Sequence, residues 1–234
     1  MATKHKIVSS AEWLKARKKL LAKEKRFLRL QDSMTAERRS LPWVKVTKSY
    51  VFEGPDGELP FTELFDGRSQ LIVYHFMFTG SNNAGCPHCS LRADGFDGIN
   101  VHLRNRDVTM VAVSRAPYKK LAAYQKRMGW TFPWVSSRDT DFNFDFNVSF
   151  TPEAIANGTA FFNFAQQDPG HTEREGHSVF VTDRRGNIYH TYSCYARGNE
   201  PLNIHYHYLD MVPNGRDEDG RGPFWVRRRD EYGQ

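Results

Sequence analysis

Two cysteines three residues apart, Cys86 and Cys89, are the side chains of this sequence best suited to chemistry. Pro87 and His88 separate them, and an apolar run over residues 71–78 precedes them. Proline suits the first position of a helix, because its missing N–H would have no partner there anyway. Cys86 is therefore expected at the helix N-cap, where free backbone N–H groups and the positive end of the helix dipole favour a thiolate over a thiol.

This arrangement predicts thiol–disulfide exchange. The Cys86 thiolate would attack a disulfide, Cys89 would resolve the mixed disulfide, and the imidazole of His88 would stabilise the thiolate further. A CxxC pair alone is a modest signal, but one placed between a buried strand and a helix of a βαβ pattern is strong. The alternative is an inactive pair on a binding or assembly module, which would use the basic N-terminal arm and the aromatic segment 141–147 as its interface.

A structural zinc site is the second alternative for the cysteines. Such a site needs four Cys or His ligands, and this chain has three cysteines and no second CxxC. Cys194 could contribute only if the fold brought it together with histidines, of which the candidates are His171, His177, His190, His205 and His207. His205 and His207 would share one side of a strand, an arrangement more often found in ordinary surface pairs, and Cys194 suits apolar packing. We therefore predict no metal and no cofactor.

Arg115 and Trp134 follow predicted strands that should end close to the dithiol. Open α/β sheets bind ligands at the carboxyl ends of their strands. Both side chains are therefore expected to line a substrate cleft, together with Phe142 or Phe144. Trp134 could equally belong to the core.

Composition limits the kind of protein. The 234 residues are 39% hydrophobic, which is enough for one good core but short for two full-sized domains. No run of about 18 apolar residues is present, so no transmembrane helix is expected. Residues 1–8 contain no apolar stretch of the kind a secretory signal needs. With only three cysteines, a reducing cytoplasmic location is the expectation.

The net charge of +6 is unevenly distributed. Residues 1–40 carry twelve Lys and Arg against four Asp and Glu, a local excess of +8. Such an arm could contact nucleic acid or acidic lipid. No nucleic-acid motif or interleaved aromatic residues accompany the charge, so we interpret it as a solvated helix face and expect neither nucleic-acid nor membrane partners.

The basic arm is predicted to be one long helix. Ser9 and Glu12 have the spacing of a capping box, and the helix should continue to about Arg39. Its apolar residues form a narrow stripe with a period of seven, namely Trp13, Leu20, Phe27 and Met34. The stripe must be covered by the chain's own core or by a second copy in a homodimer, and the spacing does not choose between them.

The rest of the chain alternates strands and helices. Strands are predicted at 71–78, 108–114 and 132–135, a helix from Cys89 to about Arg104, another from Ala116 to Gly129, a strand-like or lid segment at 141–147, and a hairpin of 179–183 with 188–192. This order predicts parallel strands with right-handed crossovers. We divide the chain into a basic helical arm (1–45), an α/β domain (46–212) and a charged C-terminal tail (213–234).

The order of elements resembles the thioredoxin-like fold in its peroxiredoxin-type branch: an α/β three-layer fold with a central mixed sheet, an N-terminal helical arm and an insert before the closing hairpin. More closely, the chain is similar to a bacterial thioredoxin-like family of unknown function whose members are labelled predicted dithiol–disulfide oxidoreductases. The segments that carry this resemblance are Leu41–Val44, Phe65–Phe78, Gly85–Ser90 and Tyr195–Gly198. It implies a disulfide-containing protein or a small thiol as substrate.

Three departures from the related families matter. Gly176-His177-Ser178 stands where thioredoxins place a cis-proline that holds substrate, so His177 is expected to line the cleft. The PxxxTxxC pattern of peroxiredoxins fails at Thr79 and Asn83, which disfavours the alternative of a thiol peroxidase. The tryptophan that usually precedes a thioredoxin motif is also absent. The central Pro87-His88 pair instead resembles that of disulfide-forming members, in which it makes the dithiol more oxidising.

Overall fold

The computed structural model describes residues 5–233, and the chain divides into two compact units, Met1–Pro42 and Trp43–Gln234. The first unit consists of helix α1 (Ser10–Arg39). The predicted capping box is confirmed, because the Ser9 hydroxyl accepts from the Glu12 N–H while the Glu12 carboxylate accepts from the Ser9 N–H. No residue of α1 is buried, and its heptad side chains are all more than half exposed.

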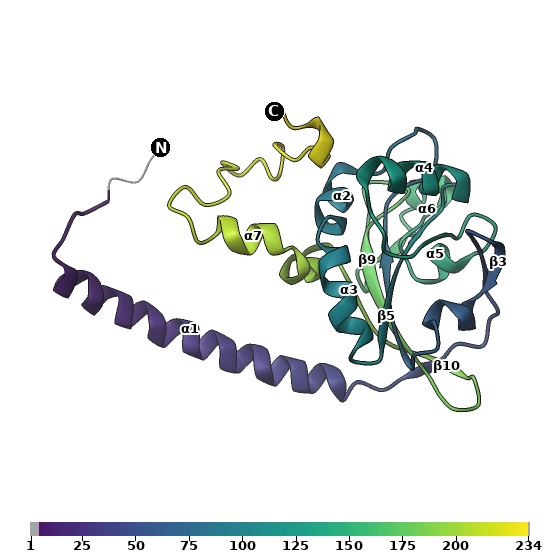
Figure 1. Cartoon of the computed structure of the whole chain (residues 1–234), viewed down its shortest axis with the longest axis horizontal. Coiled ribbons are helices and arrows are strands. Elements are labelled where there is room, and N and C mark those ends of the chain that lie inside the picture. Colours follow the sequence, from purple (N-terminus) through teal and green to yellow (C-terminus); the bar gives the residue numbers. More distant parts are fainter. Residues whose placement is uncertain (1–4, 234) are drawn as a thin grey trace. The chain divides into compact units, whose positions relative to one another are not determined.

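The second unit is built on an eight-stranded sheet (Figure 1). Its strands are β1 (Val44–Lys45), β2 (Val51–Gly54), β3 (Gly57–Pro60), β4 (Gln70–His75), β5 (Val108–Ser114), β6 (Trp134–Ser136), β9 (Gly176–Thr182) and β10 (Ile188–Tyr195), in the spatial order β1-β10-β9-β4-β5-β6-β2-β3. Strands β4, β5 and β6 are parallel, whereas β9 runs antiparallel to β4 and β10 antiparallel to β9. Two parallel strands beside an antiparallel hairpin, in the order β10-β9-β4-β5, form a thioredoxin-like core, as the sequence predicts.

The helices and short elements of this unit pack on the faces of the sheet or come after its last strand along the chain. They are η1 (Phe61–Phe65), α2 (Pro87–Ala93), α3 (Phe96–Arg104), α4 (Tyr118–Met128), α5 (Phe142–Asp145), α6 (Pro152–Ala156), the β7 (Phe161–Phe162) and β8 (Ala165–Gln166) pair, η2 (Ala196–Leu202), α7 (Ile204–Leu209) and η3 (Arg229–Glu231). Alternate side chains of β4 point to opposite faces: Tyr74 packs with α2, α3 and α4, and Val73 packs with η1 and α5. Because both faces are covered, the strand reads as a continuous apolar run.

The prediction of one continuous helix from Cys89 to Arg104 is wrong in one respect, because the structure has two helices there. Helix α2 ends with Asp94 as its C-cap, and α3 begins after Gly95. The Asp94 carboxylate accepts a hydrogen bond of 2.8 Å from the Trp130 indole N–H, which fixes the chain at this point. Glycine is also a poor helix former. The interruption lets α2 and α3 follow the face of the sheet separately (Figure 1).

The strand-like prediction for residues 141–147 is also wrong, since the segment contains helix α5. Phe142 and Phe146 both enter the core, and Asp141 and Asp145 both pair with Lys48 at 2.8 Å. These two pairs of residues are each four positions apart, which is the helical period. The alternation of aromatic and polar residues therefore hides a helical pattern.

The C-terminal residues fold back onto the second unit. Val226 is buried, and Arg127 of α4 forms ion pairs with Asp230 and Glu231. Within residues 5–233, no helix combines the length and apolar character needed to cross a membrane.

Candidate active site at the Cys86–Cys89 turn

The turn that carries both cysteines follows strand β4 and opens helix α2. Cys86 is the N-cap and Pro87 occupies the first helical position, as the sequence predicts. The Cys86 N–H donates to the carbonyl of Met77 at 3.1 Å, which ties the turn to the chain leaving β4. Gly85 leaves no room for a side chain, because a Cβ there would lie 2.4 Å from the Phe76 ring. The motif is therefore held against the core on its N-terminal side.

Cys86 has surroundings that favour its thiolate. The two cysteines approach to 3.9 Å, and neither is in a disulfide. A hydrogen bond from the Cys89 thiol and a second from the His88 imidazole outweigh the effect of burial and lower the pKa of Cys86 to about 4. The same contact with Cys86 raises the pKa of His88. The Cys86 thiolate and the His88 imidazole therefore stabilise each other at the start of α2.

Cys89 lies one helical turn deeper and has no exposed surface. Burial, followed by the hydrogen bond to Cys86 and the negative charge of that sulfur, raises the pKa of Cys89 well above its usual value. Its thiol also donates a hydrogen bond of 3.7 Å to Oε2 of Glu175. The proton of Cys89 thus has two acceptors, the Cys86 sulfur and the Glu175 carboxylate.

Glu175 belongs to a buried polar cluster behind the dithiol. Its Oε2 accepts from Tyr74 Oη at 3.0 Å and from Nη1 of Arg92, whose side chain is only 6% exposed. Burial raises the pKa of Glu175, but the Arg92 charge and the hydrogen bonds from Arg92 and Tyr74 outweigh it and hold that pKa below its usual value. Glu175 is therefore a carboxylate, placed immediately before β9 and facing the Cys89 sulfur.

The C-terminal residues close another side of the turn. The Arg228 guanidinium donates twice to the Gly85 carbonyl, at 2.7 and 3.0 Å. The His88 Nε2–H donates to the Pro223 carbonyl at 3.2 Å, so the tail orients the imidazole beside Cys86. Residues 213–234, which we predicted to be a charged tail, thus contribute contacts to the site.

Two cavities open beside Cys86. The larger, of about 560 Å³, is also lined by His88, Arg92 and Glu175, together with residues of the 162–174 and 196–206 segments. The smaller, of about 360 Å³, lies toward Thr79 and Arg228. Cys86 is a wall residue of both, so a molecule in either cavity can reach its sulfur.

Of the residues predicted to line a substrate cleft, Arg115, Trp134 and His177 line neither cavity at Cys86. Arg115 packs over the Phe144 ring at 4.5 Å. Trp134 is core, with its indole N–H donating to Ser114 Oγ at 3.0 Å. His177 is buried against the Tyr74 ring, and burial lowers its pKa to about 4, so it is a neutral side chain.

The histidines considered as metal ligands are dispersed. His205 and His207 belong to helix α7, so their prediction as one side of a strand is wrong. The His177 Nδ1 is hydrogen-bonded to Asn199 at 2.8 Å. Within residues 5–233, no group of three or more His, Cys, Asp or Glu side chains is arranged to hold a metal ion.

Sequence reasoning missed the cluster of Glu175, Arg92 and Tyr74. Arg92 carried a usable signal, since it follows Cys89 by three positions and so shares its helical face. Tyr74 was hidden in an apolar run. Glu175 stands in a stretch without periodicity, and only the pairing of β9 with β4 brings it to the cysteines.

Comparison with known proteins gives a family and several similar folds. A family model described as "Bacterial protein of unknown function (DUF899)" matches residues 2–232. The comparison with curated proteins finds no match. Similar solved structures include peroxidoxin BcpB from Mycobacterium tuberculosis (11% identity, 70% of this chain and 94% of that one, TM-score 0.46) and a Xanthomonas campestris peroxiredoxin Q mutant (12%, 68% and 90%, 0.44). A putative protein disulfide isomerase from Bacteroides thetaiotaomicron is 16% identical over 77% of this chain and 98% of that one, with a TM-score of 0.39.

Proposed function

The chain belongs to the bacterial family of unknown function (DUF899), and we propose that it is a dithiol–disulfide oxidoreductase in which Cys86 is the nucleophile and Cys89 the resolving thiol. One observation carries this proposal. Two sulfurs one helical turn apart have opposite acid–base behaviour, since the pKa of Cys86 is lowered to about 4 and that of Cys89 is raised. At neutral pH one sulfur is ready to attack while the other keeps its proton.

The first step is attack of the Cys86 thiolate on one sulfur of a substrate disulfide, RS–SR. The S–S bond of the substrate breaks, one RS⁻ leaves, and a mixed disulfide Cys86–S–S–R forms. The sulfur of Cys86 then carries no charge. Both the hydrogen bond and the negative charge through which Cys86 raises the pKa of Cys89 are lost. The resolving thiol therefore becomes more acidic at the stage when it must react.

In the second step the Cys89 thiol loses its proton and its sulfur attacks Cys86, so the second RS⁻ leaves. Glu175 lies within hydrogen-bond reach of Cys89 and is also a wall residue of the larger cavity, which gives the proton a route to solvent. The balance is one substrate disulfide and two protein thiols giving two small thiols and a Cys86–Cys89 disulfide. A thiol reductant must restore the dithiol, and in the reverse direction the same steps oxidise a partner.

A redox titration tests this proposal. The purified full-length protein is equilibrated in glutathione buffers of defined poise, and the alkylated thiols are counted by intact mass. We expect two thiols to titrate together, with a potential within the range of roughly −270 to −120 mV that dithiol oxidoreductases span. The transition should vanish in Cys89→Ser and persist in Cys194→Ser, since Cys194 is a buried residue of β10 outside the CxxC turn. If no Cys86–Cys89 disulfide forms across that range, the chain is instead a redox-inert binding module.

A further inference from the structure

We propose that the larger cavity at Cys86 binds a small disulfide whose two halves carry carboxylates, an inference that rests on the dithiol function and names its substrate class. The cavity measures about 560 Å³, which lies within the range of roughly 300–1,000 Å³ typical of small-molecule sites. Its walls come from α2, from residues 171–175, from α7 and from the tail at Pro223. Cys86 thus stands in a concave site, where a small disulfide can enter more readily than a disulfide on a folded protein.

The charges of the cavity wall leave a positive surplus. The ion pair of Arg92 with Glu175 is neutral overall. Glu200 pairs with two arginines, with Arg197 at 2.8 Å and with Arg216 at 2.7 Å. Arg216 also pairs with Asp210 at 2.7 Å, so the two arginines and the two carboxylates of this group balance.

Arg174 supplies the positive surplus. It packs over the Phe162 ring at 5.2 Å, and no salt bridge between residues 5 and 233 involves it. The surplus is local, because residues 41–234 carry a net charge of −2, the difference between +6 for the chain and +8 for residues 1–40. Guanidinium groups are the side chains best shaped to bind carboxylates.

The same walls also offer apolar surface beside the thiol. Met77, Leu91, Phe162 and Tyr206 line the cavity. They suit the methylene groups that flank the sulfurs of a small disulfide, while the arginines suit its charged ends. The preference for an anion is diagnostic, since an isolated thiolate repels anions and would react fastest with a cationic disulfide.

The test uses three disulfides of similar size: dithiodipropionate, which is anionic, hydroxyethyl disulfide, which is neutral, and cystamine, which is cationic. Each is mixed at low salt with the fully reduced protein, and the second-order rate of Cys86–Cys89 disulfide formation is followed by intact mass after alkylation. We expect dithiodipropionate to react about tenfold faster than cystamine, the size of effect that one charge-assisted hydrogen bond gives. Insulin, as a folded protein disulfide, should react more slowly than dithiodipropionate.

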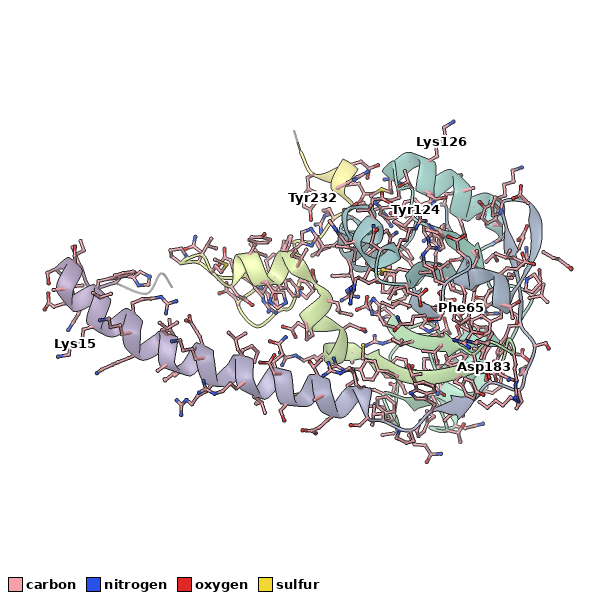
Figure 2. The ribbon with its side chains drawn as sticks, turned by 60° about the horizontal axis from the view of Figure 1, so that its bottom comes forward. Lys15, Phe65, Tyr124, Lys126, Asp183 and Tyr232 are labelled. Carbon is pink, nitrogen blue, oxygen red and sulfur yellow. The ribbon has the colours of Figure 1, made fainter. Side chains whose placement is uncertain are left out.

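Arg174→Gln should lower the rate with dithiodipropionate by about tenfold and lower the rate with cystamine much less. Arg197→Gln provides a second variant that should fold normally, because that side chain is 91% exposed. Arg185→Gln is the matched control. Arg185 stands in the β9–β10 turn beside Asp183, at the end of the sheet away from α4 and its Tyr124 (Figure 2).

The outcomes separate this inference from the function on which it rests. If none of the three small disulfides oxidises the dithiol, the proposed function itself fails. If all three react at equal rates, if cystamine reacts fastest, or if insulin outpaces dithiodipropionate, the dithiol function stands and the anionic substrate class is overturned. Equal rates for Arg174→Gln, Arg197→Gln and wild type would overturn it too.

Discussion

Cys86 and Cys89 share one turn of helix, but they occupy two regions with opposite electrostatics. Cys86 is partly exposed at the helix N-terminus, beside the imidazole of His88. Cys89 is fully buried, and the carboxylate that it contacts belongs to Glu175. A cationic partner lowers a thiol pKa, whereas burial and an anionic partner raise it. The comparison teaches that the acidity of each sulfur is set by what surrounds it, not by the CxxC spacing.

Replacing Glu175 by Gln is the most severe way to break this comparison. The negative charge of Glu175 raises the pKa of Cys89, so its removal should lower that pKa. The Arg92 side chain, which is 6% exposed, would lose its counter-charge. Breaking a buried ion pair costs about 3–5 kcal/mol, and we expect the lower end because Glu175 is itself 24% exposed. Urea unfolding measures the loss of stability, and ultraviolet titration of the thiolate in a Cys86→Ser background measures the pKa of Cys89.

The double variant Glu175→Gln with Arg92→Gln is the matched control for this prediction. It removes both charges, so it should recover much of the lost stability. A pKa of Cys89 that is unchanged or higher in Glu175→Gln would mean that Glu175 does not contribute to the difference between the two sulfurs.

Replacing His88 by Ala should test the Cys86 side of the comparison, by weakening the effect that lowers the pKa of Cys86. With the pKa of Cys86 at about 4, the rate of its alkylation should be constant at neutral pH and fall as the pH drops through that value, because protonation removes the thiolate. Without the imidazole the midpoint should move upward, yet it should stay below the usual thiol value because the larger contribution, the Cys89 hydrogen bond, remains. A hydrogen bond to a charged group contributes about 1.5–3 kcal/mol, so alkylation near pH 5 should slow roughly tenfold.

His102→Ala serves as the control for the imidazole, since His102 is exposed on α3. It should leave the pH profile of Cys86 alkylation as it is in the wild type. An unmoved midpoint in His88→Ala would assign the lowered pKa of Cys86 to Cys89 and the helix N-terminus alone.

The helix side of the site could be predicted from the sequence because its signals act over a few residues. The N-cap at Cys86 and the proline after it follow from local backbone geometry. The apolar runs likewise predict the parallel strands and the closing hairpin. Where two local patterns compete, as in the aromatic segment that became α5, the prediction failed, since the spacing of four was hidden within an alternation of two.

The carboxylate side could not be predicted, because its contacts join distant parts of the chain. Arg92 and Glu175 are 83 positions apart, and Gly85 and Arg228 are 143 apart. No local preference of a glutamate or an arginine encodes such a partner; only the register of β9 on β4 and the path of the tail bring them together. The predicted cleft residues Arg115 and Trp134 have other contacts, since Arg115 packs over the Phe144 ring and Trp134 begins β6 with its indole donating to Ser114 in the core.

Tyr74→Phe gives the smallest expected effect and the finest test of the comparison. The Tyr74 hydroxyl donates to Glu175 at 3.0 Å and accepts from Arg92 at 3.2 Å, so it supports the carboxylate without carrying charge. It also lowers the pKa of Cys89, so its removal should raise that pKa slightly, opposite in sign to Glu175→Gln. The loss of stability should be about 1.5 kcal/mol, the lower end for a hydrogen bond to a charged group, because Arg92 still holds Glu175. Urea unfolding tests the loss of stability, and the thiolate titration tests the direction in which the pKa of Cys89 moves. A fall in the pKa of Cys89 would show that the hydroxyl acts through Glu175 rather than on the sulfur.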